Sequence, residues 1–398
     1  MSNPQAVLDG PTPPAESAPS DARCTWVERE SDFLALRQKW NALVEATPNR
    51  SIFLRHEWFE AAWAWRREQA ALAILCVWRG SELIGIAPLI ASQTKVGLLT
   101  LRRLELLSVP DTQAADLIAA APEMRAVMQA MLAALIARPG WDVLQLTHLA
   151  VDSAAVQAFA HTASAHGLKW LQSAFGENPL IELGPDWQTF YAERGRRLKK
   201  SNNLTANRLK KAGEVRIDWL RGRADSATLS AWQEDIIRVS AASWKETTGL
   251  TLDNPGPQAF MRRLLAHAAE NGWLSLWRLT LDGKTVATEC QIEYAGDIFA
   301  LRADYDQAHR ELSVGSYLNW KLLEQMFATD LKRYFLGPGG NAYKLRWTER
   351  ALPLTQAAVF NRSLRGKLAA LIEISLRPRA RALRDRFRRP SQPESDSA

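Results

Sequence analysis

The feature that most constrains the fold is a set of three strand-like segments followed by a turn of small residues, a helix and one more strand. Apolar and polar residues alternate within the three segments, and Asp282-Gly283 is typical of a tight turn. Apolar residues at helical spacing then predict a helix, with Leu318, Leu322, Leu323, Met326 and Phe327 on one face. The predicted strands are 273–280, 285–293, 297–304 and 333–336, and the predicted helix is 316–329. This order predicts a fold of the mixed α/β (α+β) class.

The turn in front of that helix can hold an anion. It reads Leu312-Ser313-Val314-Gly315-Ser316-Tyr317-Leu318. Small residues at a helix start leave backbone N–H groups free, and the positive end of the helix dipole points outward. Gly-Ser is also common in ordinary helix capping. The turn therefore indicates an acyl-carrying phosphate ligand only through its place in the order of elements.

Four stretches resemble a known family: 196–213, Ser243-Trp244-Lys245, 312–318 and 337–347. With the order of elements around them, they resemble the GNAT acyltransferase superfamily. More closely, they look like its BioF2-like or CelD-like branch, which is related to the Fem-type peptidoglycan aminoacyltransferases. The resemblance covers roughly Trp26 to Leu354. It implies tandem GNAT-like domains, each a mixed, mostly antiparallel twisted sheet flanked by helices, with acyl-CoA or acetyl-CoA as donor co-substrate.

One departure from the family pattern leaves the donor open. The usual GNAT turn has the form Arg/Gln-x-x-Gly-x-Gly/Ala, whereas this chain has residues 311–316 there, with His309-Arg310 just before. Arg310 is either a substitute phosphate contact or a solvated loop cation. The predicted donor-binding residues, acting mainly through backbone N–H groups, are Arg310, Ser313, Val314, Gly315, Ser316 and Tyr317.

A weak internal repeat suggests two similar halves. Val77-Trp78-Arg79 and Leu276-Trp277-Arg278 each lie in a strand–turn–strand pattern, at Gly80-Ser81 and at Asp282-Gly283. We interpret this as a diverged duplication, although Trp-Arg is a short match. The predicted organisation is a disordered leader at 1–23, an N-terminal GNAT-like domain at 24–185 with a degenerate donor site, a donor-binding C-terminal GNAT-like domain at 186–358, and a basic amphipathic helix and tail at 359–398.

The first half repeats the mixed helix–strand pattern without a convincing phosphate turn. Its segment Ser108-Val109-Pro110-Asp111-Thr112 precedes an acidic, Ala-rich stretch that would repel an anion. The donor site is therefore expected in the second half, and the resemblance implies that the first half supplies one wall of the acceptor groove. We expect helices at 32–46, 57–68 and 123–137, and strands at 71–78, 82–90, 101–107, 142–146, 168–173 and 180–183.

Acyl transfer needs a base for the acceptor and an acid for the leaving thiolate. Glu289, on the middle predicted strand, is either a solvent-facing carboxylate or a base with a raised pKa, and Asp304 is the second candidate. Tyr343 stands where many GNAT enzymes keep a tyrosine acid. Lys344 beside it would orient the acceptor or neutralise an anion, unless Tyr343-Lys344 only caps the return of the chain. The resemblance also implies that strand-edge amides near 300–304 hold the carbonyl.

The predicted acceptor-binding residues are Arg196, Trp244, Lys245, Gly339 and Asn341. Arg196 opens a basic segment that reaches Lys211 and that either attracts an anionic acceptor or forms a solvated face. The Trp244 ring either stacks on an acceptor such as a sugar or packs between domains. Gly339 lies in Gly337-Pro338-Gly339-Gly340, which forms either a wall close to a ligand or a tight connection.

Composition adds limits. The three cysteines are far apart, so neither a disulfide framework nor a metal site is indicated, and we predict no metal. Residues 1–23 lack the apolar stretch of a secretory signal, and no apolar run is as long as a membrane span, so we expect a cytoplasmic protein. Residues 362–389 carry ten Arg or Lys against Glu373 and Asp385. This segment either packs on the domain, lies on the inner face of an anionic membrane or binds an acidic partner; binding to nucleic acid is the less favoured alternative.

The leading functional hypothesis is an acyltransferase that moves an acyl group from acyl-CoA, or from an acyl carrier protein, to an amine or hydroxyl. The acceptor would be a small molecule or a glycan precursor of the cell envelope or of an exopolysaccharide such as cellulose. Transfer would be direct in a ternary complex, and Cys290 is the only thiol near enough to Glu289 to change that. One alternative is a Fem-type transferase with an aminoacyl-tRNA donor. Another is a non-catalytic accessory protein of a polysaccharide-synthesis complex.

Overall fold

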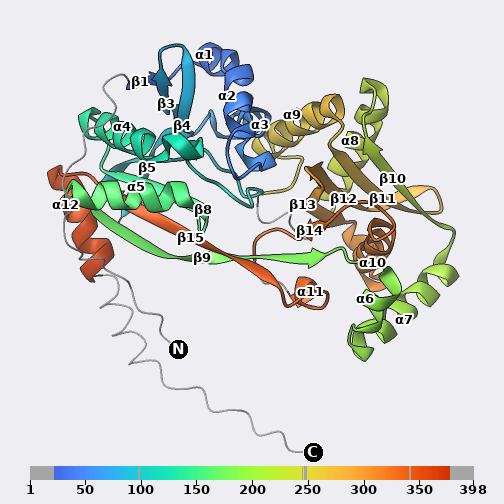
Figure 1. The fold of residues 1–398 in the computed structure, drawn as a ribbon. Helices are drawn as coiled ribbons and strands as arrows, with labels where there is room; N and C mark the ends of the chain where they lie inside the picture. Colours follow the sequence, from blue (N-terminus) through green and yellow to red (C-terminus); the bar gives the residue numbers. More distant parts are fainter. Residues whose placement is uncertain (1–21, 97–98, 244, 246–248, 340–341, 377–398) are drawn as a thin grey trace, which may run out of the picture.

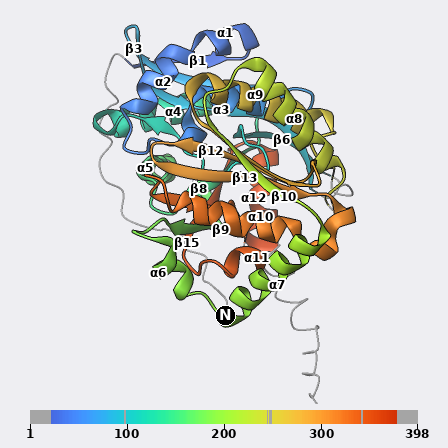
Figure 2. The same ribbon diagram turned by 90° about the vertical axis from the view of Figure 1, so that its right-hand side faces the viewer.

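Two sheets with helices packed against them form the molecule, which is a computed structural model (Figures 1 and 2). The structure describes residues 22–96, 99–243, 245, 249–339 and 342–376. Within these residues, one sheet has four strands in the order β1-β3-β4-β7, and the other has eleven in the order β10-β11-β12-β13-β14-β9-β15-β8-β6-β5-β2. The predicted mixed α/β class with helices flanking mostly antiparallel sheets is confirmed.

Strands and helices occur in groups along the chain. The strands are β1 Ala22–Val27, β2 Ala71–Leu72, β3 Ile74–Arg79, β4 Glu82–Ala87, β5 Leu89–Val96, β6 Leu99–Leu106, β7 Ile118–Ala119, β8 Val143–Ala150, β9 Lys169–Glu182, β10 Val215–Gly222, β11 Leu274–Leu281, β12 Lys284–Tyr294, β13 Asp297–Tyr305, β14 Arg333–Phe335 and β15 Ala351–Phe360. The helices are α1 Glu30–Ala35, α2 Arg37–Glu45, α3 His56–Arg66, α4 Met124–Ala137, α5 Ala154–Ala165, α6 Trp187–Ala192, α7 Arg196–Ala212, α8 Ser226–Ala241, α9 Pro255–Asn271, α10 Val314–Met326, α11 Ala342–Leu345 and α12 Leu364–Ala370.

The two halves begin with the same topology. In the first half, β1 is followed by helices α1 to α3 and then pairs antiparallel with β3 of the β3–β4 hairpin. In the second half, β10 is followed by α8 and α9 and pairs antiparallel with β11 of the β11–β12 hairpin. Both hairpin turns use positive φ, at Gly80 in the first and at Asp282 and Gly283 in the second. The repeated order agrees with the duplication inferred from the Trp-Arg pairs.

The halves then exchange strands. β9, from the first half, pairs with β14 of the second through Leu180–Glu182. β15, from the end of the chain, lies between β9 and β8 and pairs antiparallel with both. The domain boundaries stay a prediction, with the qualification that 351–358, which we placed in the C-terminal domain, lie within the sheet strands of the first half.

Most predicted elements are present with shifted ends. The three central strands are β11, β12 and β13, and the predicted helix at 316–329 is α10, which begins two residues earlier and ends three earlier. The predicted helix at 32–46 is divided into α1 and α2 at Leu36. Segments 168–173 and 180–183 are parts of one strand, β9. The predicted leader is two residues too long, because Ala22 and Arg23 pair with Arg79 and Trp78 in β1.

Helices cover both faces of the second-half strands. On one face of β11 and β12, α10 buries Leu318, Leu322 and Leu323 against Trp277 and Leu279. On the other face, α9 packs with α3 in a core that includes Cys290 and Ile292. In the described part of the chain, no helix combines the length and hydropathy needed to cross a bilayer.

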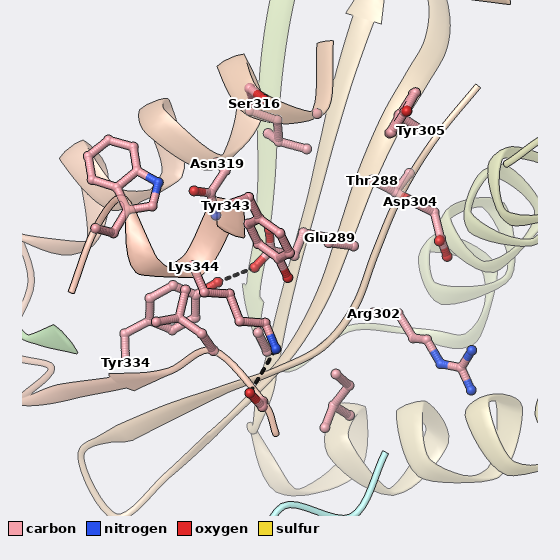
Figure 3. Close-up of a pocket in the computed structure, with 18 of the residues that line it drawn as sticks. Thr288, Glu289, Arg302, Asp304, Tyr305, Ser316, Asn319, Tyr334, Tyr343 and Lys344 are labelled. Atoms are coloured by element: carbon pink, nitrogen blue, oxygen red, sulfur yellow. Dashed lines mark hydrogen bonds between the residues drawn. The ribbon is translucent and has the colours of Figure 1, made fainter. Parts of the chain in front are cut away.

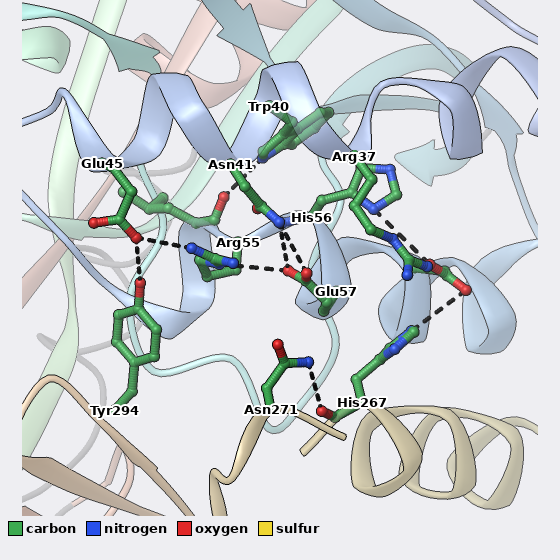
Figure 4. A network of polar contacts seen from close by, with 12 residues as sticks. Arg37, Trp40, Asn41, Glu45, Arg55, His56, Glu57, His267, Asn271 and Tyr294 are labelled. Carbon is green, nitrogen blue, oxygen red and sulfur yellow. Dashed lines mark hydrogen bonds and ion pairs between the residues drawn. The ribbon is translucent and has the colours of Figure 1, made fainter. Parts of the chain in front are cut away.

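The contact between α3 and α9 joins the two halves. Phe260 of α9 packs edge-on against Trp58 with ring centroids 5.2 Å apart, and a Cβ at Gly256 would lie 2.4 Å from the Trp65 ring. Glu60 accepts a hydrogen bond from Arg37 and lies 3.4 Å from Nε2 of His267 (Figure 4). Burial raises the pKa of Glu60, but His267 and Arg37 lower it to about 2. This interface holds the first half against the strands that carry the cavity described next.

Candidate active site

A cavity of about 530 Å³ lies where β13 and β14 separate (Figure 3). The two strands pair in parallel only through Asp297–Phe299 and Arg333–Phe335. Beyond that point β13 continues to Tyr305, whereas the chain after β14 stays beside β9, with Leu336 N–H bonded to Pro179 O and Gly339 N–H to Glu177 O, both at 2.9 Å. A bulge opposite Cys290/Gln291 further bends β13. The opened edge of β13 at 300–305 therefore lines the cavity.

The start of α10 forms one side of this cavity. Ser313 precedes the helix with φ 54° and ψ 39°, and its side chain makes no capping hydrogen bond. Val314, Gly315 and Ser316 are the first three residues of α10, so their backbone N–H groups have no acceptor within this helix. A Cβ at Gly315 would lie 3.2 Å from Cδ1 of Tyr305, so a branched side chain there would press on the β13 wall. Unpaired amides at the positive end of a helix can bind a phosphate.

The structure brings only part of the predicted donor-binding set to the cavity. Gly315 and Ser316 line it. Arg310 is 64% exposed and pairs with Glu311 at 3.3 Å, which agrees with the solvated alternative. The side chain of Val314 is buried in the core, and Tyr317 packs edge-on against Trp320. Only backbone groups of Ser313 and Val314 can therefore take the predicted role.

Glu289 is the buried carboxylate of the cavity. It is 2% exposed, on the α10 face of β12, so the solvent-facing alternative is wrong. Tyr334 OH donates a hydrogen bond to Oε1 (Figure 3). Gln291 Nε2 donates to the same oxygen at 2.8 Å. Burial raises the pKa of Glu289, while the hydrogen bonds from Tyr334 and Gln291 oppose that rise. A carboxylate whose pKa is raised is a better proton acceptor than one with its ordinary pKa.

A chain of hydrogen bonds fixes the orientation of Gln291. Its Oε1 accepts from Ser275 Oγ and from Trp277 Nε1, each at 2.9 Å. Ser275 Oγ in turn accepts from Trp219 Nε1 at 3.0 Å. Two donors on the amide oxygen leave its nitrogen to face Glu289, so strands β10 and β11 help to orient a group on β12.

Tyr343 and Lys344 lie on the short helix α11 at the opposite side of the cavity. Although Tyr343 is 41% exposed, partial burial and the carboxylates of Glu289 and Asp304 raise the pKa of its hydroxyl. Lys344 is 4% exposed and donates to Gly337 O at 2.8 Å and to Pro338 O at 3.1 Å. Burial, with help from Lys245, lowers the pKa of Lys344 to about 8. The Tyr343 hydroxyl is thus protonated at neutral pH, and the Lys344 amine titrates close to neutral pH.

Asp304 and Lys245 neutralise each other. Lys245 Nζ lies 2.7 Å from Oδ1 of Asp304 and donates to Ala303 O at 3.0 Å. Both residues line the cavity. Of the two predicted bases, Asp304 is thus already bound by a cation, whereas the groups that donate to Glu289 are neutral.

The first half contributes a wall through the loop before β7. Arg302 of β13 is held by Asp111 at 2.6 and 2.7 Å and donates to Leu250 O at 2.6 Å, and Gln113 donates to Ala300 O at 2.6 Å. Pro110, Asp111 and Gln113 all line the cavity. Asp111, in the segment just before the acidic stretch that we expected to repel an anion, is thus a carboxylate that a buried guanidinium compensates.

Only some of the predicted acceptor-binding residues line the cavity. Lys245 lines the cavity, but Arg196 is exposed at the start of α7, and Leu198, Ser201 and Asn202 of the same helix line it instead. Gly339, with φ 97°, is exposed and outside the lining. Trp244 and Asn341 lie outside the described residues. Cys290 points to the α9 face, where burial raises the pKa of its thiol, so it presents no thiolate to the cavity.

Sequence reasoning missed Tyr334, Gln291, Arg302, Asp111 and Gln113. Only Gln291 had a local signal, since it alternates with Glu289 on the same strand face. Within the described residues, no group of three His, Cys, Asp or Glu side chains is placed to hold a metal ion.

Comparisons with known proteins agree with this geometry. Residues 196–345 match the model of the acetyltransferase (GNAT) domain. Two solved structures share the fold. The C-terminal domain of a putative lysylphosphatidylglycerol synthetase from Agrobacterium fabrum has a TM-score of 0.53 at 11% identity, covering 86% of this chain and 96% of that one. FemX has a TM-score of 0.51 at 14% identity, covering 85% and 98%. No curated protein sequence matches the chain. Residues 196–345, which carry α10, β12 and β13 of the cavity, are therefore similar to the GNAT acetyltransferase domain, and the chain shares its fold with both solved structures.

Proposed function

We propose that this protein is an acyltransferase that moves an acyl group from a CoA or acyl-carrier thioester to an amine or hydroxyl. The observation that supports this most is the meeting, in one cavity, of the first residues of α10, whose amides have no acceptor within the helix, the opened edge of β13 and the buried Glu289. The amides of α10 can bind a phosphate, and the edge of β13 can hold the carbonyl-bearing arm of the donor. Glu289 can accept a proton.

The arrangement suggests a direct transfer. The acceptor nitrogen or oxygen attacks the thioester carbonyl carbon, and its proton passes to Glu289. The C–S bond then breaks, and the departing thiolate takes the proton of the Tyr343 hydroxyl, whose raised pKa keeps it protonated at neutral pH. Lys344, held by Gly337 O and Pro338 O, would orient the acceptor. A Cys nucleophile has no part, because Cys290 points away from the cavity.

As the acceptor we propose a precursor of the cell envelope or of an exopolysaccharide, which the protein would acylate in the cytoplasm. A hydrophilic acceptor agrees with the polar groups at the cavity, among them Thr288, Ser201, Asn202 and Lys245.

The test is a titration of the purified chain with CoA, acetyl-CoA and longer acyl-CoAs, read by calorimetry and by thermal stability. Saturable stabilisation is expected, worth about 2.7 kcal/mol at a hundredfold excess over Kd. Gly315→Val should abolish it, because the added methyl groups would meet Tyr305 and crowd the amides. Gly176→Val is the matched control, since a Cβ at Gly176 meets nothing within 4 Å. A wild-type chain that binds no CoA compound would refute the proposed donor.

A second candidate, a Fem-type transferase using aminoacyl-tRNA, is favoured by the charge of α7. Leu198, Ser201 and Asn202 of this helix line the cavity, while its exposed positions include Arg196, Arg197, Lys200, Arg208, Lys210 and Lys211. Such a helix at the cavity would attract a phosphate backbone. This candidate predicts tRNA binding that weakens steeply with salt, and that Lys210→Glu/Lys211→Glu reduces while leaving CoA binding unchanged.

A further inference from the structure

Helix α12 packs with its small residues inward. Gly366, Ala369 and Ala370 are buried, and the two alanines contact a cluster with Leu101, Val143 and Phe360. A Cβ at Gly366 would lie 2.2 Å from the carbonyl oxygen of Asn361, so the helix approaches its own N-terminal loop too closely for any side chain there. The buried side of α12 is therefore made of residues with almost no apolar side chain to bury.

Two leucines of α12, and Leu371 directly after it, face outward. Leu364 is 85% exposed, and Leu368 and Leu371 are 45% and 49% exposed. Their spacing of four and three residues places them on one stripe of the helix surface. A helix on a soluble domain normally turns such a stripe toward the core. Single exposed leucines are ordinary, but a stripe beside charged residues is typical of an interaction site.

Basic residues lie beside the leucine stripe on α12. Arg365 and Lys367 are exposed on α12 itself. The sequence continues past Leu376 with Arg377, Arg379, Arg381 and Arg384, and residues 362–389 contain ten Arg or Lys against two acidic residues. The occupant of the stripe must therefore offer both an apolar layer and negative charge.

We propose that the Leu364–Leu368–Leu371 stripe, with Arg365 and Lys367 beside it, docks on an anionic lipid surface. Lipid acyl chains accept the leucines, and acidic headgroups accept the arginines and lysines. A second copy of the chain would bring like charges together across the contact. The basic residues after Leu376 would likewise meet Arg365 and Lys367 if they covered the stripe. Nucleic acid would satisfy the charges but leave the leucines in water.

Docking at this face leaves the cavity free. Figure 1 places α12 at one end of the long sheet and α10, which borders the cavity, at the other. Membrane binding and acyl transfer are thus separable, and each can fail without the other.

The experiment is flotation of the full chain with vesicles of phosphatidylcholine alone or mixed with phosphatidylglycerol. We expect binding only to the mixed vesicles, weakened by salt. Leu364→Ser/Leu368→Ser/Leu371→Ser should weaken it by at least about tenfold while CoA binding and Tm stay unchanged. The matched control is Leu204→Ser/Leu352→Ser, because these leucines are 48% and 43% exposed on α7 and β15.

A second variant separates charge from apolar contact. Arg365→Glu/Lys367→Glu should weaken binding and reduce its dependence on salt. The proposal is overturned if the wild-type chain ignores mixed vesicles at low salt, or if the triple leucine variant binds them as the wild type does. It is also overturned if light scattering shows a dimer that the triple variant makes monomeric, since the stripe would then face a second copy.

Discussion

The ion pair between Arg302 and Asp111 should be among the most costly polar contacts to break. Both side chains are almost completely buried, at 7% and 3% exposure, and two contacts of 2.6 and 2.7 Å join them. Arg302→Met would leave the Asp111 carboxylate without its hydrogen-bonded cation and Leu250 O without the Arg302 donor. Removing one partner of a buried pair costs about 3–5 kcal/mol, because the remaining charge is uncompensated.

Two further variants define the origin of that cost. Arg302→Met/Asp111→Asn removes both charges of this pair and should recover part of the lost free energy of unfolding. Arg333→Met on neighbouring β14 is the matched control: it also breaks a two-contact pair, with Asp297 at 2.5 and 2.8 Å, but its side chain is 45% exposed. An exposed pair contributes about 1 kcal/mol or less.

The assay is urea unfolding at two pH values. Burial raises the pKa of Asp111 and Arg302 opposes this, so loss of Arg302 lets the pKa rise further. A carboxyl group with a raised pKa takes up a proton more readily when folded, so the deficit of Arg302→Met should shrink from about pH 8 to about pH 5. A cost equal to that of Arg333→Met, or one that does not change with pH, would refute the reasoning.

Two other predictions concern carboxylates. Tyr334→Phe removes a donor to the charged form of Glu289, so the pKa of Glu289 should rise further; the infrared band of its protonated carboxyl, assigned with Glu289→Gln, should persist to higher pH than in the wild type. An unmoved band would contradict this. The pKa of Glu60, lowered to about 2 by His267 and Arg37, implies stability that is present above about pH 4.5 and lost as pH falls toward 2. Glu60→Gln should therefore show a smaller loss of unfolding free energy than the wild type over that interval, and equal losses would show that Glu60 is not responsible.

The sequence predicted the second-half core well because its signals are local. Strands β11 to β13 have clear alternation and a turn at Asp282-Gly283, and α10 has a regular apolar face. Strand β9 was predicted as two pieces because Gly176 and Pro179 are unfavourable in a strand interior. Pairing with β15 on one part and β14 on the other overrides that local preference.

Site residues could be predicted only where their type and their place in the order of elements both indicate a role. Glu289, Tyr343 and Lys344 could be proposed from residue type and order, and the structure places all three at the cavity. Asp111 and Arg302 are 191 residues apart, so no spacing relates them. The role of Tyr334 depends on the parallel pairing of β14 beside β13, which a three-residue strand does not reveal.

The position of β15 has a consequence for biosynthesis. β15 is the last of the described strands to leave the ribosome, yet it lies between β8 and β9 in the finished sheet. Until it arrives, both neighbours present open edges on which another nascent chain could pair. The same dependence means that neither half can be excised as an autonomous unit: a fragment ending at residue 345 would keep the whole of α10 and still lack the strand that closes its sheet.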